Sequence, residues 1–82
     1  MSILSGSSIL ITGGTGSFGK AFLKEVLENH DPRRVVIFSR DELKQYEVRN
    51  QFNNDPRLRW FIGDIRDEKR LRRALHGVDY VV

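Results

Sequence analysis

The fold is decided by the stretch Ile9-Leu10-Ile11-Thr12-Gly13-Gly14-Thr15-Gly16-Ser17-Phe18-Gly19-Lys20. Three apolar residues lead into a glycine-rich turn, and a helical spacing of apolar residues begins near Phe18. A strand, a glycine-rich loop and a helix in this order form the context in which such a loop binds a dinucleotide. The amide N–H groups that open the helix point toward the phosphates, whose negative charge the helix dipole stabilises.

Three glycines in this stretch have distinct physical tasks. Gly13 permits the sharp turn off the strand, Gly16 lets the backbone approach a pyrophosphate, and Gly19 lets the helix pack closely on the strand. Their spacing, Gly-x-x-Gly-x-x-Gly after Thr12, is similar to that of extended short-chain dehydrogenase/reductase proteins. The alternative is a turn with a purely structural role, and the flanking strand and helix weigh against it.

Length and composition limit the classes of protein that this chain can represent. Its 82 residues suffice for one small domain, and the absence of cysteine excludes disulfides and thiolate metal sites. A net charge of +3 does not require a nucleic-acid partner. The longest apolar run, Val35-Val36-Ile37-Phe38, is too short to cross a membrane, and the first residues lack the features of a signal peptide. We therefore expect a cytoplasmic protein with no nucleic-acid or membrane partner.

Strands and helices are expected to alternate along the chain. Apolar runs predict strands at 8–12, 35–38, 58–62 and 78–82, and helical spacing predicts helices at 17–29, at about 40–53, and between Asp67 and Gly77. Ser39 and Glu42 form a capping box for the second helix, and Asp67 is a good N-cap for the third. The alternation predicts an α/β protein. Its fold would be a partial Rossmann fold with three helices and a four-stranded parallel sheet in the order 3-2-1-4.

The apolar pattern also predicts how well each element is covered. The second helix has the thinnest apolar face, formed by Leu43, Tyr46, Val48 and Phe52. The alternation in residues 58–62 is typical of an edge strand. Because the sequence stops inside the predicted strand 78–82, we expect residues 1–82 to be the N-terminal part of an NAD(P)-binding Rossmann domain, truncated in its fourth strand. We expect self-association through residues 78–82, since their open edge would otherwise be unpaired.

The residues after the second strand indicate the cofactor. In a dinucleotide fold this position meets the adenosine ribose, about 20 residues after the glycines, and NAD proteins usually carry Asp or Glu there. Here Ser39 and Arg40 occupy the position, with Lys44 one helical turn on. A hydroxyl, a guanidinium and an ammonium would bind the 2′-phosphate of NADP. The alternative is that Ser39 is only a cap and that the two cations are solvated, and Asp41 or Glu42 could instead reach a ribose hydroxyl.

The end of the third strand lies on the same rim of the predicted sheet. Asp64 can accept a hydrogen bond from the adenine amino group, and Ile65 offers an apolar wall, although Asp64 can also be read as a turn residue. The basic run that follows is interpreted as a solvated helix face, because no aromatic residues are interleaved with Arg66, Lys69, Arg70, Arg72 and Arg73. His30 and His76 are expected at the surface near helix ends, and no metal site is predicted.

Three segments carry a family resemblance. The loop 9–20, the segment Ser39-Arg40-Asp41-Glu42-Leu43-Lys44-Gln45 and the segment Phe61-Ile62-Gly63-Asp64-Ile65-Arg66-Asp67 resemble the N-terminus of UDP-N-acetylglucosamine 4,6-dehydratases. These are the inverting, polysaccharide-biosynthesis type of extended short-chain dehydrogenase/reductase. The resemblance implies a tightly held NADP and a UDP-sugar substrate. The implied reaction oxidises the sugar at C4, eliminates water across C5 and C6, and returns the hydride to C6 with inversion at C5.

The family's cofactor contacts can be carried over onto this sequence. With the two flanking glycines of the loop, the implied contacts are Gly13, Thr15, Gly16, Ser17, Phe18, Gly19, Ser39, Arg40, Asp41, Glu42, Leu43, Lys44, Asp64 and Ile65. The family's catalytic Tyr and Lys would lie beyond Val82, and neither Tyr46 nor Tyr80 stands in a Tyr-x-x-x-Lys setting. The resemblance therefore implies a cofactor-binding segment that has no catalytic residue of its own.

Two other interpretations remain open at the level of sequence. One is a fragment of an NAD-dependent nucleotide-sugar epimerase or reductase, against which Ser39 and Arg40 weigh. The other is a minimal Rossmann unit with only a structural or folding role, which would fit a chain that stops inside a strand. A titration with both nicotinamide dinucleotides distinguishes these interpretations.

Overall fold

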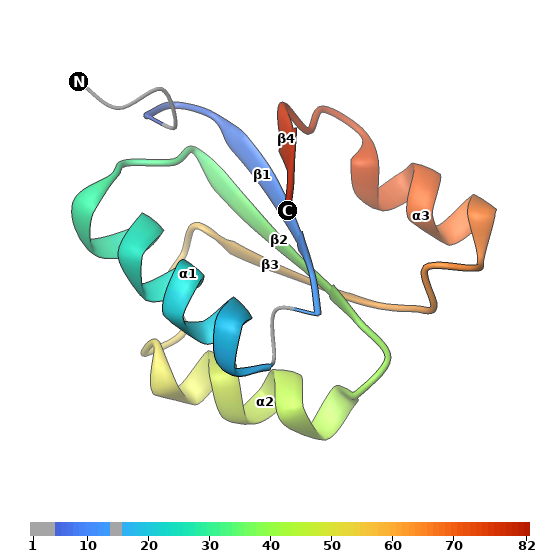
Figure 1. The fold of residues 1–82 in the computed structure, drawn as a ribbon, viewed down its shortest axis with the longest axis horizontal. Helices are drawn as coiled ribbons and strands as arrows, with labels where there is room; N and C mark the ends of the chain where they lie inside the picture. The colour runs from blue at the N-terminus through green and yellow to red at the C-terminus, as the bar shows by residue number, and fades with distance from the viewer. Residues whose placement is uncertain (1–4, 14–15) are drawn as a thin grey trace.

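A four-stranded parallel sheet lies at the centre of the molecule, with the strand order β3-β2-β1-β4 (Figure 1). The computed structural model describes residues 5–13 and 16–82. Its elements are β1 (Ser8–Thr12), α1 (Ser17–Asn29), β2 (Arg34–Ser39), α2 (Glu42–Gln51), β3 (Leu58–Ile62), α3 (Glu68–Leu75) and β4 (Tyr80–Val81). The predicted fold class, strand order and three helices are thus confirmed.

The two central strands are buried on both faces of the sheet. β1 and β2 run in register, so that Leu10 lies beside Val36 and Ile11 beside Ile37. Successive side chains of a strand point to opposite faces, and each face has its own core. One core, beneath α1 and α2, contains Ile9, Ile11, Leu23, Val26, Val35, Ile37, Val48 and Leu58. The other, beneath α3, contains Leu10, Val36, Phe38 and Ala74. Figure 1 shows α1 and α2 on one side of the strands and α3 on the other.

The helix boundaries follow from the N-caps. The Asp67 carboxylate accepts a hydrogen bond from the Arg70 N–H, which confirms the predicted cap of α3. The predicted capping box of α2 is wrong. Asp41 caps that helix instead by accepting from the Lys44 N–H at 3.0 Å, while the Ser39 hydroxyl oxygen accepts from the Asp41 N–H at 3.1 Å. A carboxylate is the stronger acceptor for an N-terminal N–H, so α2 begins at Glu42 rather than Arg40.

The inward face of α2 matches the predicted face at Val48 and Phe52 and differs from it at Leu43 and Tyr46. Leu43 and Tyr46 are 67% and 55% exposed, whereas Gln45 and Val48 are buried. Positions three and four apart share a helix face, so Gln45, Val48 and Phe52 lie together toward the sheet, whereas Leu43 and Tyr46 lie outside that face. Polar Gln45 is therefore buried at the helix face where the apolar pattern had predicted Leu43 and Tyr46.

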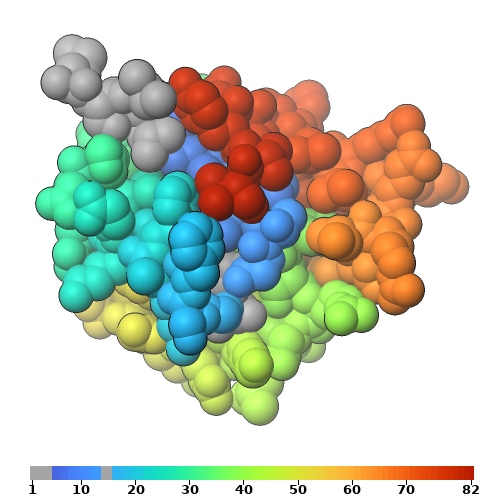
Figure 2. Space-filling view, viewed as in Figure 1, coloured from blue at the N-terminus to red at the C-terminus, as the bar shows by residue number. Residues whose placement is uncertain are grey.

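The two outer strands have different lengths. β3 is the predicted edge strand, and β4 is shorter than predicted, with Tyr80 and Val81 paired to Ile9 and Leu10. The positive φ of Gly77 (+74°) places it in the left-handed region just after α3, which confirms the predicted helix stop. Residues 80–82 lie at the surface, where Figure 2 shows them in red. Self-association through residues 78–82 stays a prediction.

No helix within residues 5–13 and 16–82 is long and apolar enough to cross a membrane.

Candidate functional site

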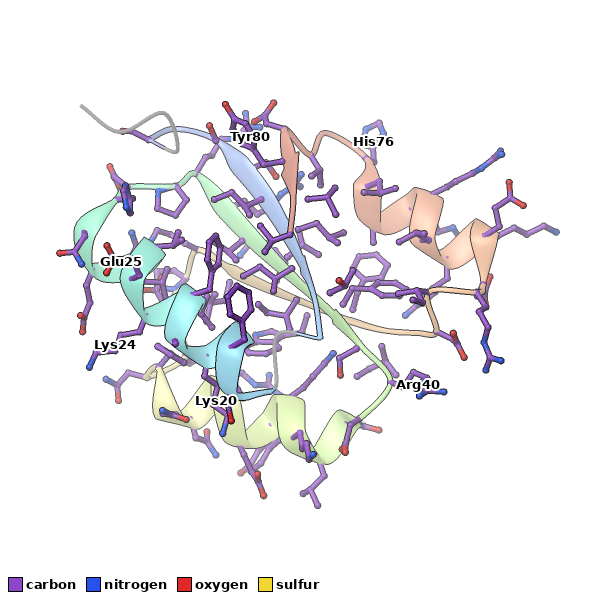
Figure 3. The ribbon with its side chains drawn as sticks, viewed as in Figure 1. Lys20, Lys24, Glu25, Arg40, His76 and Tyr80 are labelled. Carbon is purple, nitrogen blue, oxygen red and sulfur yellow. The ribbon has the colours of Figure 1, made fainter. Side chains whose placement is uncertain are left out.

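A hollow of about 650 Å³ opens where β1, β2 and β3 end. Parallel strands end at the same edge of a sheet, so the loops that follow these three strands meet there. The hollow is lined by Thr12, Gly13, Phe38, Ser39, Arg40, Asp41, Lys44, Gly63, Asp64, Ile65 and Arg66. In Figure 3 Arg40 lies at this edge, whereas His76 and Tyr80 lie at the opposite end of the sheet.

Half of the predicted cofactor contacts converge on this hollow. They are Gly13, Ser39, Arg40, Asp41, Lys44, Asp64 and Ile65. Gly16 and Ser17 line a smaller hollow nearby, of about 210 Å³, which Lys44 also lines. Gly19 is buried in α1, while Phe18, Glu42 and Leu43 are exposed and line neither hollow. Thr15 lies outside the described residues. The cofactor contacts of these residues stay predictions.

The glycine loop shows why two of its glycines are needed. Gly13 has a positive φ of +66°, which a side chain would disfavour, and its N–H donates to the Phe38 carbonyl. Its carbonyl in turn accepts from the Gly16 N–H at 3.1 Å. A Cβ on Gly16 would lie 3.6 Å from the Gly13 oxygen, an ordinary contact, and Gly16 has a φ of −81°. The described surroundings therefore accept a side chain at Gly16, and the approach of a pyrophosphate to its backbone stays a prediction.

The N-terminus of α1 differs from those of the other two helices. α2 and α3 each begin with an Asp cap and a Glu in the first turn. In contrast, α1 begins at Gly16 with no side-chain cap and no acidic residue in its first turn. The positive end of its dipole is thus left uncompensated by these residues, as an anion-binding helix requires.

The end of β2 presents donors to the large hollow. Ser39 is only 9% exposed, and its hydroxyl oxygen accepts from the Asp41 N–H. A hydroxyl that accepts one hydrogen bond still has its O–H as a donor. Arg40 is largely exposed, with its guanidinium Nη1 3.5 Å from the Asp64 carboxylate. Lys44 follows on the first turn of α2. A hydroxyl and two cations therefore border the same space.

Asp64 is bound by a neighbouring arginine. Its Oδ1 accepts from the Arg66 backbone N–H at 2.9 Å, and its Oδ2 accepts from the Arg66 guanidinium at 2.8 Å. These hydrogen bonds from Arg66, with a smaller contribution from Arg40, hold the pKa of the Asp64 carboxyl well below its usual range. Asp64 is therefore a charged acceptor at neutral pH. Asp64 thus closes a turn and also lines the hollow, and its contact with an adenine amino group stays a prediction.

Arg66 and Arg70 depart from the solvated helix face that the sequence suggests. Arg66 precedes α3 and lines the hollow. The Arg70 guanidinium lies 4.9 Å from the Phe61 ring centre and donates to the Ile62 carbonyl at 2.8 Å. A Cβ on Gly63 would approach the Arg70 Cγ to 2.8 Å and the Phe38 ring to 2.9 Å. The spacing of Asp64 and Arg66, two residues apart, could have indicated from sequence that Arg66 bonds to Asp64. No local feature of the sequence predicts the contacts of Arg70.

The other titratable candidates are remote from the hollow. His30 and His76 are the C-cap residues of α1 and α3, as expected for residues near helix ends. Tyr46 lies on the exposed side of α2. In the described part of the chain, no group of three or more His, Cys, Asp or Glu residues is placed to hold a metal ion.

Comparison with known proteins gives consistent relatives. A family model described as "Polysaccharide biosynthesis protein" matches residues 9–82. A UDP-N-acetylglucosamine 4,6-dehydratase (inverting) from Campylobacter jejuni is 52% identical over 80 residues, which cover 98% of this chain and 24% of that protein. A UDP-glucose 4-epimerase from Rickettsia massiliae is 51% identical over 77 residues, which cover 90% of this chain and 22% of that protein. The chain thus spans about a quarter of the length of these curated relatives.

Solved structures share the fold. Pen from Bacillus thuringiensis superposes with a TM-score of 0.92 at 37% identity, over 99% of this chain and 25% of that one. A wide-type short-chain dehydrogenase/reductase from Veillonella parvula, solved in complex with NADP, gives a TM-score of 0.78 at 17% identity. The match covers 92% of this chain and 33% of that one. At that identity the second likeness establishes the fold alone, which is a Rossmann-type fold.

Proposed function

Because the chain belongs to the family of polysaccharide biosynthesis proteins, we propose that its large hollow binds the adenosine end of NADP. The protein would be the cofactor-binding part of a nucleotide-sugar 4,6-dehydratase that acts on UDP-N-acetylglucosamine. Residues 1–82 would form the N-terminal part of its Rossmann domain. The proposal extends a coarser conclusion, that the cofactor is a nicotinamide dinucleotide, which the fold and the family support.

One observation carries the choice of NADP. Ser39, Arg40 and Lys44 border one hollow at the end of β2, where the ribose of a dinucleotide lies in this fold. A hydroxyl donor and two cations suit the three acceptor oxygens of a 2′-phosphate. Of the two carboxylates on the same segment, Asp41 has an oxygen committed to the Lys44 N–H as the cap of α2, and Glu42 does not line the hollow.

The remaining parts of the cofactor have matching surroundings. The uncapped N-terminus of α1 suits the pyrophosphate, and glycine at position 16 leaves room for it to approach the backbone. Charged Asp64 would accept from the adenine amino group, and exposed Ile65 would contact the apolar face of the ring. The residues present therefore fit a dinucleotide from adenine to pyrophosphate.

The proposed overall reaction uses the cofactor as a temporary hydride store. The sugar is oxidised at C4, water leaves across C5 and C6, and the hydride returns to C6 with inversion at C5, so no net oxidation occurs. The residues described here bind and orient the adenosine end, and we assign none of them to the sugar chemistry. UDP-sugar binding and catalysis would belong to the remainder of a protein of the relatives' length.

An NAD-dependent epimerase is the second candidate. It is favoured by the identity to UDP-glucose 4-epimerases and by the second oxygen of Asp41, which borders the hollow and could accept from a ribose hydroxyl. In that case Arg40 and Lys44 would be surface cations. The two candidates differ in which dinucleotide the chain prefers.

Calorimetric titration of the chain with NADP and with NAD tests the proposal. We expect NADP to bind at least tenfold more tightly, a difference of about 1.4 kcal/mol. Arg40→Ala with Lys44→Ala should remove that preference while leaving NAD affinity nearly unchanged. Lys24→Ala is the control, since Lys24 is an exposed lysine on α1 away from the large hollow (Figure 3). Preference for NAD, or binding of neither dinucleotide, would contradict the proposal.

A further inference from the structure

Gln45 is a buried amide on the helix that borders the hollow. Its side chain is 4% exposed, although Leu43 and Tyr46 beside it on α2 are exposed. Burying an amide costs free energy unless its polar atoms are hydrogen-bonded, so an apolar residue would be the simpler choice for this position. The side chain of Gln45 therefore needs an explanation beyond packing.

The Gln45 amide links two adjacent strands. Its Nε2 donates to the Phe61 carbonyl of β3 at 2.9 Å and lies 3.5 Å from the Ser39 carbonyl of β2. The Ser39 carbonyl also accepts from the Gly63 N–H at 2.9 Å. In the strand register Ser39 pairs with Ile62, which is the last pair before the two strands separate into loops. Gln45 thus joins β2 and β3 at the point where their pairing ends.

Both loops that diverge from this point line the large hollow. One carries Ser39, Arg40 and Asp41, and the other carries Gly63, Asp64 and Ile65. The separation of the two strand ends sets the distance between the ribose side and the adenine side of the hollow. Gln45 itself does not line the hollow, so any influence on a ligand must act through these strand ends.

We propose that Gln45 is a positioning residue for the dinucleotide site, which holds the ends of β2 and β3 at the separation that the adenosine part of the cofactor requires. This inference rests on the proposed function. A side chain of the same length without a donor would fill the same space, but it would leave the Phe61 carbonyl without the Gln45 hydrogen bond. The strand ends would then adopt a range of separations, and affinity would fall without loss of the fold.

Gln45→Met tests this role, because methionine is unbranched, similar in volume and unable to donate. We expect the Kd for NADP to rise about tenfold, equivalent to about 1.4 kcal/mol. We also expect the ratio of NADP to NAD affinity to fall, because the Ser39 segment moves. The control is Val26→Ala, which removes buried volume from the same core at a residue of α1 that lines neither hollow. It should lower stability but leave both dissociation constants unchanged in the folded protein.

Hydrogen exchange provides a readout without ligand. In Gln45→Met the Gly63 amide, which donates to the Ser39 carbonyl, should exchange faster relative to the amides of β1. In Val26→Ala this ratio should stay as in the wild type. Wild-type NADP affinity and selectivity in Gln45→Met would overturn the positioning role and leave the proposed function standing. Failure of the wild-type chain to bind either dinucleotide would overturn both.

Discussion

At the scale of single residues, the Asp64 carboxylate is the most strongly perturbed group in the hollow. It accepts from both the backbone and the guanidinium of Arg66, and Arg40 lies 3.5 Å away. Its folded pKa lies below its unfolded value, which is about 3.9. Any stabilisation from this pair is therefore complete above the unfolded pKa and is lost as the pH falls toward the folded pKa.

This pairing gives a first prediction. The Asp64 carboxyl carbon, followed by NMR from pH 6 to pH 2, should remain in its ionised state below pH 3.9, the ordinary midpoint of an aspartate. Arg66→Gln should return the midpoint toward the ordinary value, because the dominant hydrogen bonds come from Arg66. An unchanged midpoint in Arg66→Gln would show that Arg66 does not control this carboxyl.

Two glycines near the hollow should respond differently to substitution. Gly63→Ala places a methyl group 2.8 Å from the Arg70 side chain and 2.9 Å from Phe38. Overpacking of this kind costs about 1–3 kcal/mol, to be measured by urea denaturation. A wild-type midpoint in Gly63→Ala would mean that Arg70 moves aside at no cost.

The matched substitution is Gly16→Ser. Serine is a favoured N-cap, and the described contacts leave room for it, so stability should stay within about 0.5 kcal/mol of the wild type or rise. Dinucleotide affinity should fall by about tenfold or more, because the side chain occupies the space that we assign to the pyrophosphate. Unimpaired binding in Gly16→Ser would contradict that placement of the pyrophosphate.

At the scale of elements, α3 depends strongly on its cap. It spans only Glu68–Leu75, too short to be stable alone, and it is the one helix over the core that contains Leu10, Val36, Phe38 and Ala74. Asp67→Ala should therefore destabilise the protein by about 1 kcal/mol, within the usual range for a lost N-cap. Asp67→Asn keeps an acceptor and should retain most of the stability. Equal denaturation midpoints for Asp67→Ala and wild type would contradict this account.

The elements also show what the sequence can predict. Strands β1 and β2 were predictable because continuous apolar runs fit strands that are covered on both faces. The start of α2 was not, because Ser39 and Asp41 are both good N-cap residues and their local preferences differ little. The spacing within α2 decides which residues face the sheet, and Gln45, Val48 and Phe52 lie three and four positions apart. An apolar pattern then selects Leu43 and Tyr46, and it cannot identify Gln45 as interior.

At the scale of the whole molecule, the two cores are unequal. Eight buried residues lie beneath α1 and α2, and four lie beneath α3. β4 adds only the pairs of Tyr80 and Val81, both of which are exposed. Less apolar area secures this side of the sheet, so it should open at a lower free energy than the other.

Hydrogen exchange of the free protein tests this asymmetry. The amides of α3 and β4 should exchange faster than those of α1, β1 and β2 through partial opening of the molecule. Saturating dinucleotide at about 100 times its Kd should add about 2.7 kcal/mol to global stability. Uniform protection across all elements would indicate that the fold opens only as one unit.

The convergence of the site depends on the strand order, which the alternation of elements predicts. Once β1, β2 and β3 are adjacent, the residues that follow them must share one edge, and the positions of Ser39, Arg40 and Asp64 follow directly. Contacts between side chains that are far apart in the sequence were harder to predict. The stacking of Arg70 on Phe61 and the link from Gln45 to Phe61 depend on the packed distance between helix and strand, which no local pattern specifies.

The lining of the large hollow comes entirely from residues between Thr12 and Arg66. A single uninterrupted length of gene therefore encodes the whole surface that we assign to the adenosine end of the cofactor. One recombination event across those codons would transfer dinucleotide preference between relatives without altering the codons for the sugar chemistry. Under the proposed function, the choice of coenzyme would be inherited separately from the choice of reaction.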